Sequence, residues 1–184
     1  MDSTHLYTHK ERMSTRPHWL REDRLNHRGQ PFSSGALERW QNFPSDELGT
    51  WVDLDLETKL EWLYLVRLHW FALCGGGREV PPEGTTYTMD GGCITDRPSL
   101  HLALGEAING PRGYFGGCLD ALADCLCGGF GAPERFTLVW QNSEVARTAF
   151  PATWEEARSG PSDGARLAPF DEYVAVFGDR VVLR

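Results

Sequence analysis

Lysine is scarce in this sequence of 184 residues, because only Lys10 and Lys59 occur among 18 basic side chains. The 26 acidic side chains outnumber the basic ones and give a formal net charge of −8. A broad surface for nucleic acid phosphates needs clustered positive charge, so we expect no direct binding of nucleic acid. A basic partner suits this chain better than an acidic one.

Long hydrophobic runs are also absent. The most apolar stretch, residues 60–73, is interrupted by Glu61, Arg67 and His69. It falls short of the ~20 apolar residues that span a bilayer, so we expect no membrane segment. The first residues lack the pattern of a signal peptide, and the five cysteines have no disulfide or metal spacing. A reducing, cytoplasmic setting is therefore expected.

Catalytic and cofactor motifs are missing too. No spacing of Ser, His and Asp indicates a triad, and the glycine runs at 75–77 and 128–131 lack the Lys and Ser or Thr of a phosphate loop. We expect neither an enzyme nor a bound metal or cofactor. Cys118, Cys125 and Cys127 are interpreted as buried small side chains, and His101 as a residue on a helix surface. The tryptophans Trp62, Trp70 and Trp140 are expected to fill the core.

The composition divides the chain into three parts. Residues 1–48 are polar and are expected to be disordered or loosely packed, with a basic arm for nucleic acid as the weaker alternative. Residues 49–84 form an extension and linker, in which Val52, Leu54 and Leu56 alternate as in a strand and residues 60–74 have helical spacing. The pair Pro81 and Pro82 then precedes a main domain over residues 85–184.

The main domain alternates strands and helices. We expect strands at 85–89, 136–140 and 181–184, the second one buried on both faces. Helices are expected at 100–109 after the caps Asp96 or Ser99, at 119–127, at 143–147 with Ser143 as a cap, and at 170–177, with one helical turn at 154–158. Parallel strands need such crossovers, so the prediction is an α/β fold with a small three-stranded parallel sheet packed with helices, plus the N-terminal extension.

One short helix carries the strongest functional signal. Asp120 and Asp124 are four residues apart, so both carboxylates share one helix face, where they repel each other by a few tenths of a kcal/mol. A solvated face is the ordinary explanation for such a pair. The alternative is a binding site for a cationic partner.

The surrounding residues resemble a known family. The segment Leu119-Asp-Ala-Leu-Ala-Asp-Cys-Leu126, with Tyr114-Phe-Gly116 before it and Phe136-Thr-Leu-Val-Trp140 after it, is similar to barstar, the intracellular inhibitor of barnase-type ribonucleases. The resemblance covers residues 85–184. It implies that an acidic helix and its preceding loop bind the basic active site of a ribonuclease, with Asp124 in the phosphate-binding site. The resemblance assigns partner contacts to Tyr114, Gly116, Asp120, Asp124, Phe130 and Asp179.

The sequence departs from the family pattern at contact positions. Cys118 stands where the family commonly has Asn, Ala123 replaces a Trp, and Gly129 stands at another Trp position, with Phe130 beside it. The expected function is an intracellular immunity protein that is a monomer when free and inhibits a toxic ribonuclease. The alternative is a barstar-fold interaction module with a different target, and a hydrolytic enzyme is a remote third possibility.

Overall fold

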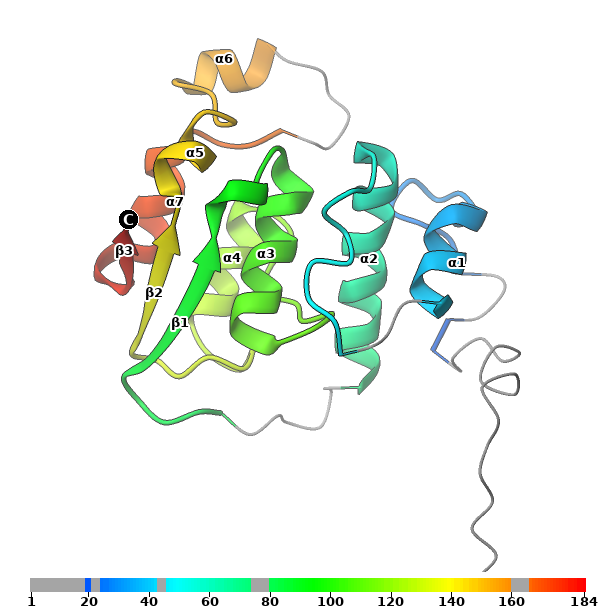
Figure 1. Ribbon diagram of the computed structural model, residues 1–184, viewed down its shortest axis with the longest axis horizontal. Helices are drawn as coiled ribbons and strands as arrows, with labels where there is room; N and C mark the ends of the chain where they lie inside the picture. Colours follow the sequence, from blue (N-terminus) through cyan, green and yellow to red (C-terminus); the bar gives the residue numbers. More distant parts are fainter. Residues whose placement is uncertain (1–18, 21–23, 43–45, 74–79, 160–165) are drawn as a thin grey trace, which may run out of the picture.

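A parallel β-sheet forms one side of the molecule in the computed structural model (Figure 1), which describes residues 19–20, 24–42, 46–73, 80–159 and 166–184. The three strands β1 (Thr85–Asp90), β2 (Phe136–Gln141) and β3 (Val181–Leu183) lie in the order β1-β2-β3. Both pairings are parallel, with Thr85 opposite Phe136 and Leu138 opposite Val181. The predicted α/β fold with three parallel strands is confirmed.

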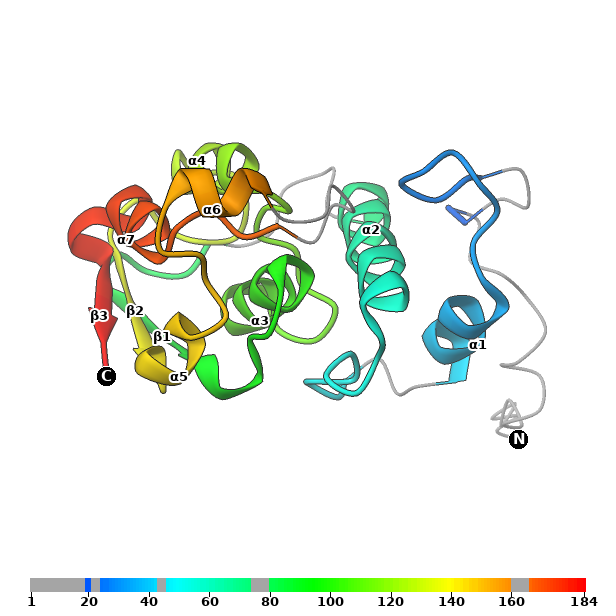
Figure 2. The same ribbon diagram turned by 90° about the horizontal axis from the view of Figure 1, so that it is seen from above.

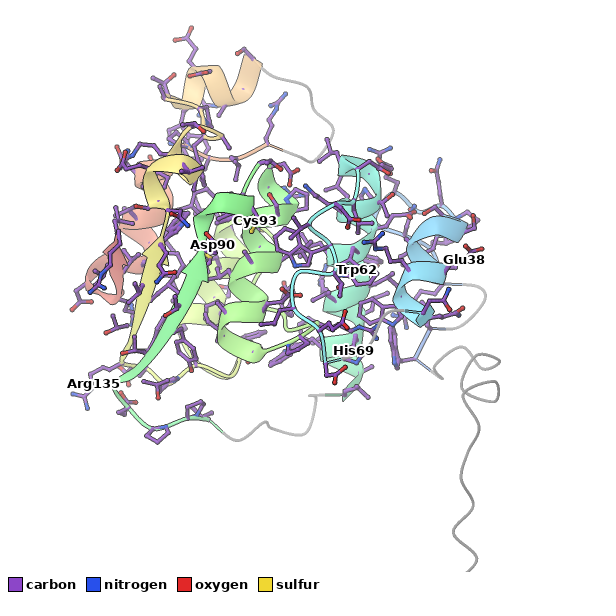
Figure 3. The ribbon with its side chains drawn as sticks, viewed as in Figure 1. Glu38, Trp62, His69, Asp90, Cys93 and Arg135 are labelled. Atoms are coloured by element: carbon purple, nitrogen blue, oxygen red, sulfur yellow. The ribbon has the colours of Figure 1, made fainter. Side chains whose placement is uncertain are left out.

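The central strand β2 is buried mainly on one face. Phe136, Leu138 and Trp140 are buried, whereas Thr137 and Val139 between them are half-buried. The prediction of a strand buried on both faces is therefore wrong, although its central position is right. Asp90 marks the carboxyl end of β1 and Arg135 the opposite end of the sheet (Figure 3). At the carboxyl end of β1, the Asp90 carboxylate accepts a 2.7 Å hydrogen bond from the Asn142 side chain.

Two helices connect β1 to β2. After the 3-10 turn η1 (Gly91–Cys93), α3 (Arg97–Asn109) begins at a capping box in which Asp96 accepts from the Ser99 backbone and Ser99 accepts from the Asp96 backbone. Both residues predicted as alternative caps thus cooperate. The second helix, α4 (Leu119–Leu126), lies where the sequence predicts it.

Three helices and a turn connect β2 to β3. They are α5 (Ser143–Arg147), α6 (Trp154–Ser159), α7 (Phe170–Phe177) and the 3-10 turn η2 (Gly178–Arg180). The residue at the N-cap of α5 is Asn142, in the left-handed region, and not Ser143. Ser143 instead uses its hydroxyl to donate to the Arg184 carbonyl, at 3.1 Å, which ties α5 to the C-terminal strand.

Two helices precede the sheet: α1 (Ser34–Asn42) lies in the N-terminal segment 1–48, and α2 (Leu56–Leu73) lies in the extension 49–84. The sheet, α3, α2 and α1 follow one another across the molecule in both views (Figures 1 and 2). Phe32, Ala36 and Trp40 are buried within this arrangement, so the described residues 24–42 are packed and not loose. Residues 1–18, with most of the predicted basic arm, and residues 74–79, with Cys74 and the glycine run, lie outside the described residues.

The predicted strand at Val52 to Leu56 is wrong. Residues 52–54 form a turn and a bend, and Leu56 is already the first residue of α2. The Asp55 carboxylate accepts hydrogen bonds from the backbone and the hydroxyl of Thr58, at 3.0 and 2.9 Å. A local cap of this kind competes with strand pairing and starts α2 at the next residue. Among the described helices, none is long and apolar enough to cross a membrane.

The predicted core tryptophans are confirmed, because Trp62, Trp70 and Trp140 are all buried. Trp62 and His69 both come from α2 (Figure 3). His101, however, is only 1% exposed, which overturns its expected position on a helix surface. The cause is that α3 lies between the sheet and α2, so it has almost no solvent face.

Candidate partner-binding site

The acidic helix α4 presents its carboxylates to solvent because its apolar side chains are buried. Leu122, Cys125 and Leu126 face the core, whereas Asp120 and Asp124 are exposed. Cys118 occupies the N-cap position and makes no side-chain hydrogen bond there. The Cys118 thiol therefore does not cap α4, as the side chain of an asparagine at this position could.

No cation neutralises the two carboxylates within the described part of the chain. Neither carboxylate has a hydrogen bond or an ion pair there, although eight other carboxylates of these residues have arginine, lysine or side-chain amide partners. Asp120 lies in the first turn of α4, where the helix macrodipole favours negative charge. Asp124 lies beyond the first turn, so the macrodipole stabilises its negative charge less. The geometry suits a binding site for a cationic group.

Gly116 sets the path of the loop before α4. Its φ is +85°, and a Cβ atom at this position would lie 2.8 Å from the backbone nitrogen of Leu122. A side chain would therefore collide with the first turns of α4. The resemblance assigns this glycine to close approach of a partner, but in this structure the close approach is to the helix itself.

Tyr114 is buried under the extension. It is 5% exposed, and its ring lies 5.9 Å from that of Phe71 on α2 and 6.5 Å from that of Phe130. Burial raises the pKa of its hydroxyl to about 12, with smaller contributions from nearby groups that include Asp124. The predicted partner contact of Tyr114 therefore has little free surface in this structure.

The two loops that flank α4 are held by one amide. Asn109, at the end of α3, donates from Nδ2 to the carbonyl oxygens of Tyr114 and Phe130, at 2.8 and 2.9 Å. Asn109 is buried, so these two hydrogen bonds satisfy its amide group and fix the backbone of both loops. Sequence reasoning missed this residue, whose only signal was its place before Gly110 at the end of a predicted helix.

A cavity of about 360 Å³ opens between α2 and the loop before α4. Tyr64 and Leu63 form part of its apolar wall, and Cys118 lies at its edge. Arg97 lines the cavity and donates a hydrogen bond to the Gly117 carbonyl, so it also fixes the loop. The extension and the acidic helix thus share one surface region.

The remaining predicted residues occupy separate positions. Asp179 is exposed on η2, which contacts α7 and β2, and it does not belong to the continuous segment 114–130 that carries the other five site residues. Cys118 and Cys127 are exposed, so the expectation that they are buried is wrong, whereas Cys125 is buried as expected. No group of metal-binding side chains occurs among the described residues.

The comparisons with known proteins give one match. Neither the curated proteins nor the solved structures include a match to this chain. A family model described as Barstar (barnase inhibitor) matches residues 85–164, which include β1, α3, α4 and β2, while α7 and β3 lie beyond the match. Residues 85–164, a segment of the chain, therefore match the barstar family model.

Proposed function

We propose that the protein inhibits a ribonuclease by binding its basic active site with α4. The observation that carries the proposal is the pair of exposed carboxylates, Asp120 and Asp124, which have no cationic partner among the described residues and lie within the segment that matches the barnase inhibitor family. A helix buried on its other face holds such carboxylates rigidly. Rigid charges lose little entropy when a partner binds.

The proposed mechanism is steric and electrostatic. A ribonuclease holds RNA phosphates with Arg, Lys and His, so its free cleft carries a positive potential. The carboxylate of Asp124 would take the place of a phosphate oxygen and accept charge-assisted hydrogen bonds. Where the donor is Arg, the guanidinium would donate two parallel hydrogen bonds to the two carboxylate oxygens. The body of the inhibitor would then exclude RNA. No step requires catalysis, a cofactor or binding to nucleic acid by the inhibitor.

The proposal includes a cellular role. The protein would act as a cytoplasmic immunity protein against a toxic ribonuclease and would be a monomer before binding it. Residues 85–184 would form the inhibitor domain, and residues 49–84 an extension of it. The net charge of −8 would speed the encounter with a cationic enzyme.

A titration of ribonuclease activity tests the proposal. The full chain is added in increasing amounts to barnase, and RNA cleavage is followed by fluorescence. We expect cleavage to be lost at a molar ratio of one to one. Undiminished cleavage at a large molar excess would contradict inhibition of a barnase-type enzyme.

A second candidate function is an interaction module with a target that is not a ribonuclease. It is favoured by Ala123 and Gly129, which occupy positions of contact tryptophans in the resemblance, and by the burial of Tyr114. Aromatic side chains dominate the energetics of many interfaces, so their loss would redirect binding. The same titration separates the two candidates, because only the first predicts loss of RNA cleavage.

A further inference from the structure

An aromatic cluster joins the extension to the loops around α4. Phe71 of α2 lies 5.9 Å from Tyr114 and 6.3 Å from Phe130, and the latter two rings are 6.5 Å apart. These distances are typical of attractive edge-to-face and tilted contacts. The cluster therefore combines one ring from outside the family match with two rings from inside it.

The members of this cluster differ in their exposure. Tyr114 is 5% exposed and Phe130 is partly buried, whereas Phe71 is 53% exposed. Phe71 thus covers Tyr114 and presents its own ring to solvent instead. Aromatic side chains are enriched among the residues that carry most of the binding energy of an interface, so an exposed ring that packs on two buried or partly buried rings is suited to contact a partner.

The acidic helix beside this cluster indicates the charge of the partner. Tyr114 and Phe130 come from the loops before and after α4, so the cluster borders the acidic helix. The guanidinium carbon of Arg67 lies 6.0 Å from the centre of the Phe71 ring. An exposed aromatic ring with an acidic helix at its border matches a partner that offers cations next to an apolar contact.

We infer that Phe71 is a contact residue for the ribonuclease, so that the partner-binding surface combines α4 with α2 of the extension. This inference rests on the proposed function. It gives Phe71, which lies outside the family match, a direct contact with the partner. The Phe71 ring would then supply an aromatic anchor in a surface that has Ala123 and Gly129 at two positions where the family commonly has tryptophan. The extension would then act as more than a cover for the inhibitor domain.

The test compares matched variants in the barnase titration. Phe71→Ala is expected to weaken inhibition at least about tenfold, as is usual for an aromatic anchor. Phe71→Tyr keeps the ring and is expected to inhibit like the wild type. Val145→Ala removes a similarly exposed apolar side chain, 55% exposed, from α5, which lies away from α4 (Figure 2), and is expected to have no effect.

The variants also separate the possible failures. If the wild type and Val145→Ala inhibit and Phe71→Ala inhibits equally well, the inference is wrong and the proposed function stands. If the wild type does not inhibit, the proposed function fails and the inference fails with it. If light scattering shows that Phe71→Ala instead abolishes a dimer without changing inhibition, the ring covers a second copy and the inference is overturned. Urea unfolding of each variant confirms that binding is compared between folded proteins.

Discussion

Gly116 and Asn109 hold the loop before α4 in place through contacts within the chain. Gly116 allows the backbone to touch Leu122, and Asn109 bonds the loops on both sides of the helix. The position of the α4 carboxylates therefore depends on two residues that carry no charge. Single substitutions at such positions act on the site through the fold.

Gly116→Ala is expected to destabilise the protein more than Gly128→Ala. Both glycines have positive φ, +85° and +103°, so each alanine costs about 1 to 2 kcal/mol of backbone strain. Only at Gly116 does the new Cβ atom also meet backbone, and the forced shift adds about 2 kcal/mol, whereas Gly128 has open space. Urea unfolding measures the difference, and equal losses for the two variants would show that the contact with α4 is unimportant.

His101 is expected to make the fold sensitive to acid. Burial, with the nearby charge of Arg97, lowers its pKa from 6.5 to about 3. Below its ordinary pKa the unfolded chain binds a proton that the folded chain does not, so stability falls as the pH drops from about 6.5 toward 3. At pH 5 the loss from this residue is about 2 kcal/mol.

The variant His101→Phe removes this titration. Both ring nitrogens of His101 lack a hydrogen-bond partner among the described residues, so Phe also removes two unsatisfied buried groups. We expect the free energy of unfolding to change less between pH 7.5 and pH 5 than in the wild type. A remaining slope is expected from His69, whose pKa burial lowers to about 4. A slope unchanged by the substitution would contradict this account.

The helix α2 is the element that connects the extension to the part of the chain that contains the sheet. The Lys59 ammonium lies 3.2 Å from the Asp96 carboxylate, which caps α3, and both side chains are largely buried. Burial alone would raise the pKa of Asp96, but hydrogen bonds from Ser99 and the charge of Lys59 lower it below its usual value. Two further bonds join the parts, from Gly49 to the Glu106 carboxylate at 2.8 Å and from Arg112 to the Trp40 carbonyl at 2.7 Å.

Lys59→Met is expected to destabilise the protein by about 2 to 4 kcal/mol, because it leaves the buried Asp96 carboxylate without its cation. Arg28→Met is the matched control. Its ion pair with Glu57 has side chains 44% and 47% exposed, so its loss is expected to cost less than about 1 kcal/mol. Thermal unfolding of both variants checks this, and similar small losses would show that the pair does not hold α2 on α3.

Elements with strong local signals were predictable from the sequence, and their packing was not. The caps Asp96 and Ser99 and the continuous run 136–140 located α3 and β2 because their signals are short-range. The segment from Val52 to Leu56 was mistaken for a strand because its apolar residues alternate with acidic ones. A strand also needs a neighbouring strand to pair with, and this pattern carries no information about one. The burial of His101 depends on α2 packing against α3, a contact that no local pattern encodes.

At the scale of the whole molecule, the negative charge and the acidic helix suit a cationic partner. The sequence indicated Asp120 and Asp124, because their spacing and the resemblance of the segment are visible in it. The covering of Tyr114 by Phe71 was not predictable, since the two residues are 43 positions apart and come from different parts of the chain. The extension therefore changes which aromatic ring a partner would meet.

The most direct test of the account is a calorimetric titration of barnase with the wild type and with Asp124→Ala. We expect the substitution to weaken binding by about 2 to 5 kcal/mol, the range typical of interfacial charge pairs, for which barnase and its inhibitor are themselves the standard example. Glu155→Ala, which removes an exposed charge from α6, is expected to bind like the wild type. Wild-type affinity of Asp124→Ala would contradict the central claim that this carboxylate occupies the basic site of a ribonuclease.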